Sequence, residues 1–338
     1  MEKGVAIAGN IIADHIKQIE SYPKQGMLCT IKAMSKGVGG CVPNTGVNLA
    51  RLDSDVRVQA IGLVGDDELG DFVLDTLEDN NVDVSCVKVI PAGVTGFTDV
   101  MNAMDTNERT FFHARGVNAQ FDIDDIDFDR INADIFHIGY ALLLDRFDVF
   151  DEQYGTKLAR TLKLASDHGL LTSMDVVSDL DPERYKKFVA PCLKYCDYII
   201  LNEIESGMVS GVEPRNENGR LDVSNIQFIC RDFFDRGVKR RVVIHAPEGG
   251  FSMNADGRFI CVPSLRLPEG YIKGTVGAGD AFCAGMLYSI YKELPEEQAL
   301  RLASCAAASN LAGPDSISGA QSVEKAMALE IAFGRQEL

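Results

Sequence analysis

The residues best suited to chemistry lie in Lys273-Gly-Thr-Val-Gly-Ala-Gly-Asp280, which runs into the apolar helical pattern Ala281-Phe-Cys-Ala-Gly-Met-Leu-Tyr288. Gly277-Ala-Gly279 should form the turn into this helix, because glycine lets a ligand approach closely and the first helical amides lack intrahelical partners. Such a turn is an anion site suited to a phosphoryl group. Asp280 would repel that group, but it would accept a proton from an attacking hydroxyl. The alternative is that Asp280 caps the helix.

Three further polar clusters occur where an expected strand ends or in a glycine-rich loop. Asp14 follows the first strand, and a carboxylate there can accept two sugar hydroxyls; the alternative is a solvated turn. Gly37-Val-Gly-Gly-Cys-Val-Pro-Asn44 would admit a ligand, or it is a structural loop. Asn202 and Glu205 could hold a hydrated Mg²⁺, or they could cap the next helix.

Short apolar runs alternate with amphipathic stretches, a pattern typical of a mainly parallel sheet covered by helices. The expected strands lack strict polar alternation, as strands buried on both faces do, and span 5–9, 58–62, 135–139, 171–175, 198–202 and 242–245. The expected helices span roughly 44–53, 67–80, 152–169, 182–195, 223–236, 279–293 and 296–311. No linker divides the chain, so we expect one domain over residues 1–338.

Two segments, residues 13–37 and 95–115, interrupt this pattern with alternating polar and apolar positions. Such alternation predicts a small antiparallel sheet apart from the main one. The small sheet is either an edge extension of the main sheet or a lid that shields a reacting group from water. A lid of this kind can also pair between subunits.

Composition excludes several classes of partner. The 338 residues carry 50 acidic and 33 basic side chains, and a net charge of −17 argues against binding to nucleic acid or an anionic membrane. No apolar run approaches the ~18 residues of a membrane span, and the N-terminus lacks a signal-peptide pattern. Nine scattered cysteines without a Cys-x-x-Cys pair fit reduced thiols, and Cys192 and Cys196 are expected to be buried thiols. We therefore expect a cytoplasmic protein with small-molecule partners.

Two common nucleotide-binding motifs are absent. Residues 1–40 contain no Gly-x-Gly-x-x-Gly between a first strand and a helix, which disfavours a dinucleotide-binding dehydrogenase. The chain also lacks Gly-x-x-x-x-Gly-Lys-Ser/Thr and is therefore not a P-loop protein.

In this order, and across nearly the whole chain, the clusters resemble the motifs of the ribokinase-like (PfkB) carbohydrate kinase family. Gly274-Thr-Val-Gly-Ala-Gly-Asp280 resembles its C-terminal signature Asp-Thr-x-Gly-Ala-Gly-Asp. Gly39-Gly40 with Asn44 resembles its N-terminal Gly-Gly motif, and Asn202-x-x-Glu205 its Asn-x-x-Glu motif. The resemblance implies an α/β fold, a three-layer α/β/α sandwich with a mainly parallel central sheet and a small β-sheet lid, often dimeric through that lid.

The resemblance also implies ATP-dependent phosphorylation of a hydroxyl group of a small sugar or sugar acid, with Mg²⁺. Asp280 would be the general base, and the anion hole would consist of Gly277, Ala278 and Gly279. The substrate would be held by Asp14, Gly39, Gly40, Asn44 and Arg109. The nucleotide would be bound by Asn202, His245, Gly250, Thr275 and Ser304. Glu205 would act on Mg²⁺ through water.

Four positions depart from the family pattern. Gly274 replaces the first Asp of the signature, which puts the family's monovalent-cation site in doubt. Val276 replaces a frequent hydroxyl residue, Val177 a polar residue, and Pro247 a glycine of the nucleotide loop. These changes would alter nucleotide affinity or ion dependence and leave Asp280 in place.

The motifs leave the substrate open. The segment Gly9-Asn-Ile-Ile-Ala-Asp-His15 resembles the opening of ribokinases and favours a pentose. In contrast, Arg109-Thr-Phe-Phe-His-Ala-Arg-Gly-Val-Asn118 is similar to fructokinases and 2-keto-3-deoxygluconate kinases. In those kinases an arginine can pair with a carboxylate or phosphate. A nucleoside kinase is one alternative. A non-catalytic sugar or nucleotide sensor on the same fold is another, but a sensor has no need of the base Asp280.

Overall fold

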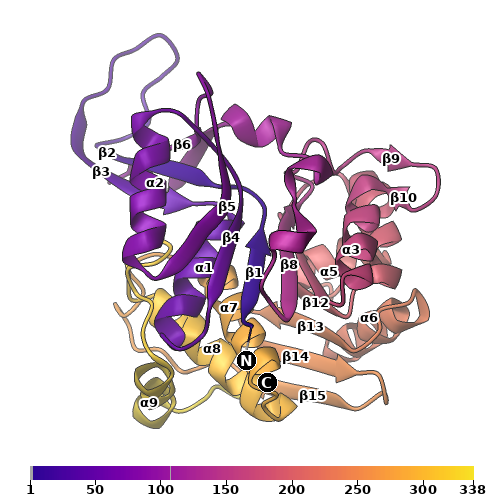
Figure 1. Ribbon diagram of the computed structural model, residues 1–338. Coiled ribbons are helices and arrows are strands. Elements are labelled where there is room, and N and C mark those ends of the chain that lie inside the picture. Colours follow the sequence, from indigo (N-terminus) through magenta and orange to yellow (C-terminus); the bar gives the residue numbers. More distant parts are fainter. Residues whose placement is uncertain (1–2, 107) are drawn as a thin grey trace.

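The computed structural model describes residues 3–106 and 108–338, which form a large central sheet with helices on both faces (Figure 1). Its strand order is β15-β14-β13-β12-β11-β8-β1-β4-β5. The strands from β5 to β13 pair in parallel, and β14 and β15 add an antiparallel edge. The bounds are β1 Val5–Ala8, β4 Val58–Gly65, β5 Val82–Ile90, β8 Ile135–Ala141, β11 Leu171–Val176, β12 Tyr198–Asn202, β13 Arg241–Ala246, β14 Gly249–Asn254 and β15 Phe259–Pro263.

The central strands bury side chains on both faces, which explains their continuous apolar sequences. In β1, Ala6 and Ala8 pack on one side with α3 (Lys157–Asp167), α5 (Glu203–Ser210) and α6 (Val223–Asp235). Val5 and Ile7 pack on the other side with the remaining large helices. These are α1 (Cys41–Leu52), α2 (Glu68–Asp79), α7 (Ala278–Tyr291) and α8 (Glu296–Asn310), and α9 (Val323–Phe333) packs on α8.

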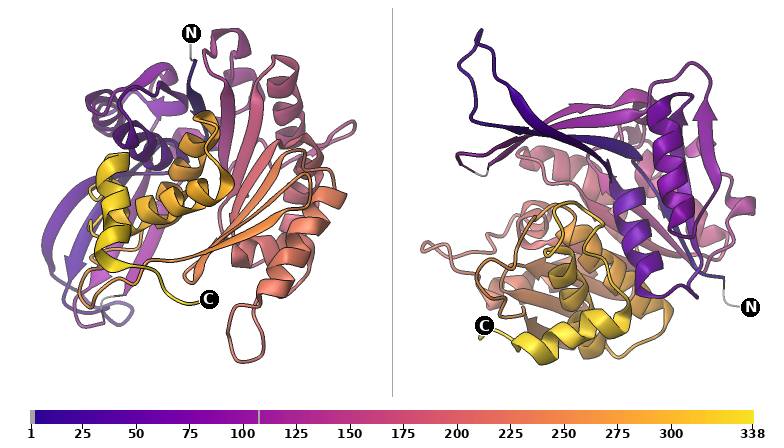
Figure 2. Two further views of the ribbon diagram at one scale, coloured as in Figure 1. Left: turned by 90° about the horizontal axis from the view of Figure 1, so that it is seen from below. Right: turned by 90° about the vertical axis from the view of Figure 1, so that its left-hand side faces the viewer.

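A second sheet projects from the main body and has the strand order β3-β2-β6-β7 (Figure 2, right). Its strands are β2 Ile12–Ile19, β3 Ile31–Gly39, β6 Gly96–Ala103 and β7 Arg109–Ala114. Both predicted lid segments are therefore strands of one separate sheet. The central pair, β2 with β6, is parallel, unlike the antiparallel sheet expected. The reason is that β2 and β6 follow β1 and β5, which run in the same direction in the main sheet.

Other differences lie at the edges and in helix boundaries. The sequence analysis did not identify β5, β14, β15, α5 or α9. The expected helix at 182–195 is α4 (Pro182–Arg184), a π-helical turn (Tyr185–Val189) and a 3₁₀ turn (Ala190–Tyr195), because Pro191 cannot donate a helical hydrogen bond. The helix expected from 152 begins at Lys157, since β9 (Phe150–Asp151) and β10 (Gly155–Thr156) precede it.

No helix in the described part of the chain is long and apolar enough to cross a bilayer. All nine cysteines lie in that part and are free thiols. Cys192 and Cys196 are buried, as expected.

Candidate active site

Asp280 lies in the first turn of α7, and the N-cap residue of that helix is Gly277. The Asp280 carboxylate is buried and accepts hydrogen bonds from three side chains of other elements: Asn44 Nδ2 at 3.0 Å, Tyr140 OH at 2.9 Å and Thr45 Oγ1 at 3.4 Å. A capping aspartate would instead accept hydrogen bonds from the amides of its own helix. The cap alternative therefore does not describe Asp280.

The environment of Asp280 favours its protonated form. Burial raises the pKa of its carboxyl group to about 7, and the negative charge of Asp175 acts in the same direction. The hydrogen bonds from Tyr140, Asn44 and Thr45 oppose this rise because they stabilise the carboxylate. A carboxyl group with a pKa near neutrality is well suited to take a proton from a substrate and release it again.

The turn before Asp280 leads into the N-terminus of α7, where the amide of Ala278 donates to Thr275 O at 3.4 Å. Gly277 has a φ of 78°, which favours glycine, and a Cβ there would lie 2.7 Å from Ser316 Cβ. Unpaired amides and the helix dipole together attract an anion. Gly277, Ala278 and Gly279 thus lie where a phosphoryl group would meet Asp280, and their role as an anion hole stays a prediction.

Four predicted substrate residues form a chain of contacts that ends at Asp280. A Cβ at Gly39 would lie 2.7 Å from the carboxylate of Asp14, so a side chain there would displace that carboxylate. Gly40, with a φ of 86°, is the N-cap of α1, and its carbonyl accepts a hydrogen bond from the Asn44 amide. Burial raises the pKa of Asp14 to about 6. These contacts lead from the lid strand β2 to Asp280.

A pocket of about 260 Å³ opens on the other side of Asp280. Asn202 and Glu205 line it, and they form the capping box that was weighed as an alternative: Asn202 Oδ1 accepts from the Glu205 amide at 2.8 Å, and Glu205 Oε2 accepts from the Asn202 amide at 3.1 Å. Ser178 Oγ donates to Glu205 Oε1 at 2.7 Å. Burial raises the pKa of Glu205 to about 7. The same two side chains therefore cap α5 and face the pocket.

The other predicted nucleotide residues are distributed differently. His245 lines the pocket beside Gly279 and packs against Phe282, with ring centroids 4.9 Å apart. Burial lowers the pKa of His245 to about 4, so its ring is neutral. The structure does not bring the remaining three to the pocket lining: Gly250 pairs with His245 inside the sheet, Thr275 is exposed in the loop before α7, and Ser304 Oγ donates to Leu300 O of its own helix.

Arg109 lies on the lid strand β7, away from Asp280. Its Nη2 donates to Pro314 O at 3.2 Å, and its side chain lines a small cavity together with Asp14, Val276 and Ser316. Arg109 is therefore on the same side of Asp280 as the predicted substrate residues.

Three pocket residues were not identified from the sequence as site residues: Tyr140, Asp175 and Ser178. Asp175 Oδ1 accepts from the Tyr140 amide at 2.6 Å, and this contact joins the ends of β8 and β11. Tyr140 adopts a φ of 63°, which is unusual for a non-glycine residue. Both residues lie where a buried strand ends, so the rule that selected Asp14 and Asn202 could have found them.

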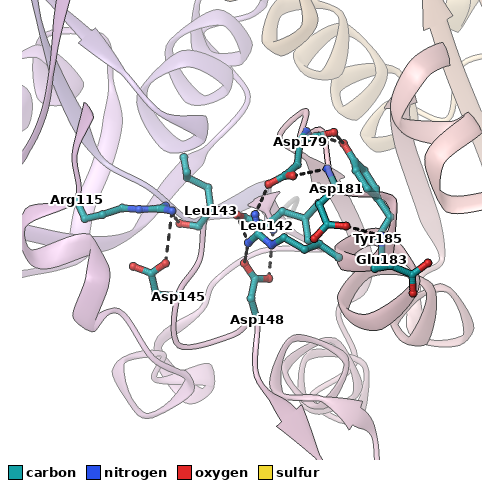
Figure 3. A network of polar contacts seen from close by, with 10 residues as sticks. Arg115, Leu142, Leu143, Asp145, Asp148, Asp179, Asp181, Glu183 and Tyr185 are labelled. Atoms are coloured by element: carbon teal, nitrogen blue, oxygen red, sulfur yellow. Dashed lines mark hydrogen bonds and ion pairs between the residues drawn. The ribbon is translucent and has the colours of Figure 1, made fainter. Parts of the chain in front are cut away.

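The loop after Tyr140 is held by a network of charged side chains (Figure 3). Arg115 Nη1 donates to Leu143 O at 2.7 Å, and Arg184 Nη2 donates to Leu142 O at 2.8 Å. Leu142 also has a positive φ, 74°. Strained backbone persists where the surroundings fix it, so these arginines stabilise the loop that directs Tyr140 to Asp280.

The residues that depart from the family pattern surround this site. At Gly274, a Cβ would lie 2.9 Å from the carbonyl oxygens of Gly313 and Pro314, so the backbone as packed leaves no room for a side chain. Val177 lines the pocket, and Pro247 is exposed in the turn between β13 and β14.

The pocket has donors that fit a nucleotide with Mg²⁺. Carboxylates of Asp175, Glu205 and Asp280 line it, and oxygen ligands are the kind that Mg²⁺ prefers. The start of α7 supplies amides for phosphate oxygens.

Comparison with known proteins supports the same family. The family model described as pfkB family carbohydrate kinase matches residues 3–322. Ribokinase of Haemophilus influenzae is 24% identical over 312 residues, which cover 91% of this chain and 92% of that protein. The 5-dehydro-2-deoxygluconokinase of Geobacillus kaustophilus is 27% identical over 289 residues, covering 81% and 78%.

The fold is also that of known ribokinases. The structure of Arabidopsis thaliana ribokinase complexed with ribose and ATP superposes with a TM-score of 0.80 at 21% identity, covering 97% of this chain and 99% of that one. The match to the family model spans almost the whole chain and includes the Asp280 motif. The chain therefore belongs to the pfkB family and is a carbohydrate kinase.

Proposed function

We propose that this kinase transfers the γ-phosphoryl group of ATP to a hydroxyl group of a small sugar or sugar acid, with Asp280 as the general base. The observation that carries the proposal is the buried Asp280 carboxylate, with a pKa of about 7, in the first turn of α7. The substrate hydroxyl would give its proton to Asp280 while its oxygen forms a bond to the γ-phosphorus. The bond from that phosphorus to the bridging oxygen would break, and ADP would leave.

The negative charge that develops would be stabilised by the amides of Gly277, Ala278 and Gly279. Bound Mg²⁺ would neutralise phosphate charge. On this proposal Glu205 holds a water ligand of Mg²⁺, and the nucleotide contacts Asn202, His245, Gly250, Thr275 and Ser304. The pocket lining supports Asn202, Glu205 and His245; the other three would need contacts from a nucleotide that extends beyond the pocket.

The substrate would lie between the lid and Asp280, held by Asp14, Gly39, Gly40, Asn44 and Arg109. Asp14 would accept sugar hydroxyls, and Asn44 would hold both the substrate and Asp280. Arg109 lines the small cavity beside Asp14 and Asp315, and its guanidinium could pair with a carboxylate of a sugar acid.

We propose that no monovalent cation is required. The position of the family's first signature aspartate is Gly274, where surrounding carbonyls leave no room for a side chain. Turnover should therefore be similar in potassium and in tetramethylammonium buffers.

We also propose a homodimer formed through the lid. Strand register places Arg109 and Phe111 on the same lid face as Asp14, whereas Phe112 and Met34 lie on the opposite face. Phe112 is 53% exposed and Met34 is 71% exposed. Exposed apolar side chains on that face favour contact with a second copy of the chain.

The proposal is tested by measuring ADP formation from Mg-ATP across pentoses, hexoses, sugar acids and nucleosides. Turnover with a sugar or sugar acid is the expected result. Turnover with nucleosides alone would replace the proposed substrate class. Thermal stabilisation by a sugar without turnover on any compound would point to a sensor and overturn the proposed activity.

A further inference from the structure

A buried cluster of metal-ligating side chains lies behind Asp280. Within residues 3–106 and 108–338, one group of three such side chains has donor atoms that all lie within 4.8 Å of one another: Cys41, His137 and Asp175, each of them buried. Cys41 is the first residue of α1, His137 lies in β8 and Asp175 in β11. The fold therefore brings together donors that are up to 134 residues apart in sequence.

Two donors of the group are already spaced like neighbouring zinc ligands. Asp175 Oδ2 lies 3.4 Å from His137 Nε2. Ligand distances of about 2.0–2.3 Å in a tetrahedral zinc site separate the donor atoms by roughly 3.3–3.8 Å. The Sγ of Cys283 in α7 lies 3.8 Å from the same nitrogen, as a hydrogen-bond partner of His137 outside the group of three.

The orientation of two donors is fixed from outside the cluster. His137 Nδ1 is hydrogen-bonded to Ser173 Oγ at 3.0 Å, which leaves Nε2 facing the cluster. Asp175 Oδ1 accepts from the Tyr140 amide at 2.6 Å, which leaves Oδ2 facing His137. Outer hydrogen bonds of this kind orient the ligands of protein metal sites.

A simple hydrogen-bonded histidine–aspartate pair accounts for the cluster less well. The distance of 3.4 Å between His137 Nε2 and Asp175 Oδ2 exceeds the usual N–H···O separation of about 2.9–3.0 Å. A thiol, an imidazole and a carboxylate within 4.8 Å of one another form a donor set that suits zinc and not Mg²⁺.

The cluster is accessible from the active-site pocket. Asp175 and Cys283 both line that pocket, so an ion could reach the cluster through it.

We propose that Cys41, His137 and Asp175 bind one Zn²⁺ ion behind the reaction centre. The ion joins α1, β8 and β11 close to Asp280. This site is distinct from the Mg²⁺ that accompanies ATP, and it does not depend on which substrate is phosphorylated.

The test is a Zn²⁺ titration of the full-length, tag-free protein, treated with a chelator and kept reduced, against a chromophoric competitor. One Zn²⁺ per chain is expected, with no displacement by millimolar Mg²⁺. Cys41→Ser should weaken binding at least about 10-fold. Cys305→Ser is the matched control, because the side chain of Cys305 is as buried as that of Cys41 but lies outside the cluster, 3.9 Å from the guanidinium of Arg335. This substitution should leave Zn²⁺ binding unchanged.

Co²⁺ provides a second readout that does not depend on activity. The wild-type protein should show a sulfur-to-cobalt charge-transfer band, and Cys41→Ser should reduce it. If Cys41→Ser fails to fold by circular dichroism, His137→Gln replaces it. The proposal is overturned if Zn²⁺ binds below one equivalent, if no cluster variant weakens binding, or if Co²⁺ gives no charge-transfer band.

Discussion

The pocket around Asp280 and the lid sheet differ in how firmly the fold fixes their side chains. Asp280 is buried and accepts hydrogen bonds from three side chains, and Tyr140 is held by a loop that two arginines anchor. In the lid, Met34, Phe111 and Phe112 are all more than half exposed. The comparison indicates that the fold holds the side chains around Asp280 in place, whereas it leaves large side chains of the lid exposed.

The largest expected effect comes from Asp280→Asn. Loss of the proposed base should reduce turnover about 10²–10⁴-fold while substrate binding persists. Steady-state ADP formation and calorimetric substrate binding measure the two quantities. Asp222→Asn is the control, because Asp222 caps α6 and should have no effect on turnover. Near-normal turnover of Asp280→Asn would contradict the proposal that the buried pocket around Asp280, and not the lid, carries out the reaction.

Tyr140→Phe should have a smaller effect that depends on pH. The Tyr140 hydroxyl stabilises the Asp280 carboxylate, so its removal should raise the pKa of Asp280. A hydrogen bond to a charged group is worth about 1.5–3 kcal/mol, so the rate at pH 6.5 should fall about 10-fold or more and recover as the pH rises. Tyr288→Phe is the control, since its hydroxyl donates to the distant Asp53. An unshifted pH profile would contradict this role.

The two faces of the lid can be separated with adjacent residues. Phe111→Ala should raise KM for the substrate several-fold and leave the dimer intact, because Phe111 lines the small cavity with Arg109. Phe112→Glu should dissociate the dimer by placing a charge on the opposite face. Sedimentation measures assembly, and steady-state kinetics measure KM. Equal effects of both substitutions on either quantity would show that the faces do not have separate roles.

The smallest expected effect is on stability. The pKa of Asp280 is about 7 in the folded protein against an ordinary value of 3.8, so the folded state binds this proton more tightly than the unfolded state. Its contribution to the free energy of unfolding is therefore present at low pH and is lost as the pH rises from about 4 to about 7. Asp280→Asn removes that loss, so its Tm relative to wild type should increase between pH 5 and pH 8. A constant difference in Tm would argue against a raised pKa.

The sequence predicted most of the buried central strands, but it predicted fewer of the outer strands and of the long-range contacts at the site. Buried parallel strands are continuous apolar runs, and the polar residues after them, Asp14 and Asn202, were found for that reason. The strands β14 and β15, at the antiparallel end of the main sheet, were missed because their sequences mix polar and apolar residues. Tyr140 could have been found by the same rule as Asp14, but its contact with Asp280, 140 positions away, could not.

Local motifs also could not decide between paired roles. Asn202 and Glu205 form a capping box at the start of α5 and also line the pocket. The capping role and a position in the pocket therefore do not exclude each other. The convergence of Cys41, His137 and Asp175 follows from strand order and helix packing, which spacing along the chain does not reveal.

The most direct test of the central claim is the pH dependence of γ-phosphoryl transfer in a single turnover, measured for wild type and Asp280→Asn with the substrate found by the panel. If Asp280 accepts the proton, the wild-type rate should rise with pH and level off above an inflection near pH 7, and the variant should be slow at every pH. A variant that keeps the wild-type rate and the same inflection would contradict the assignment of Asp280 as the base.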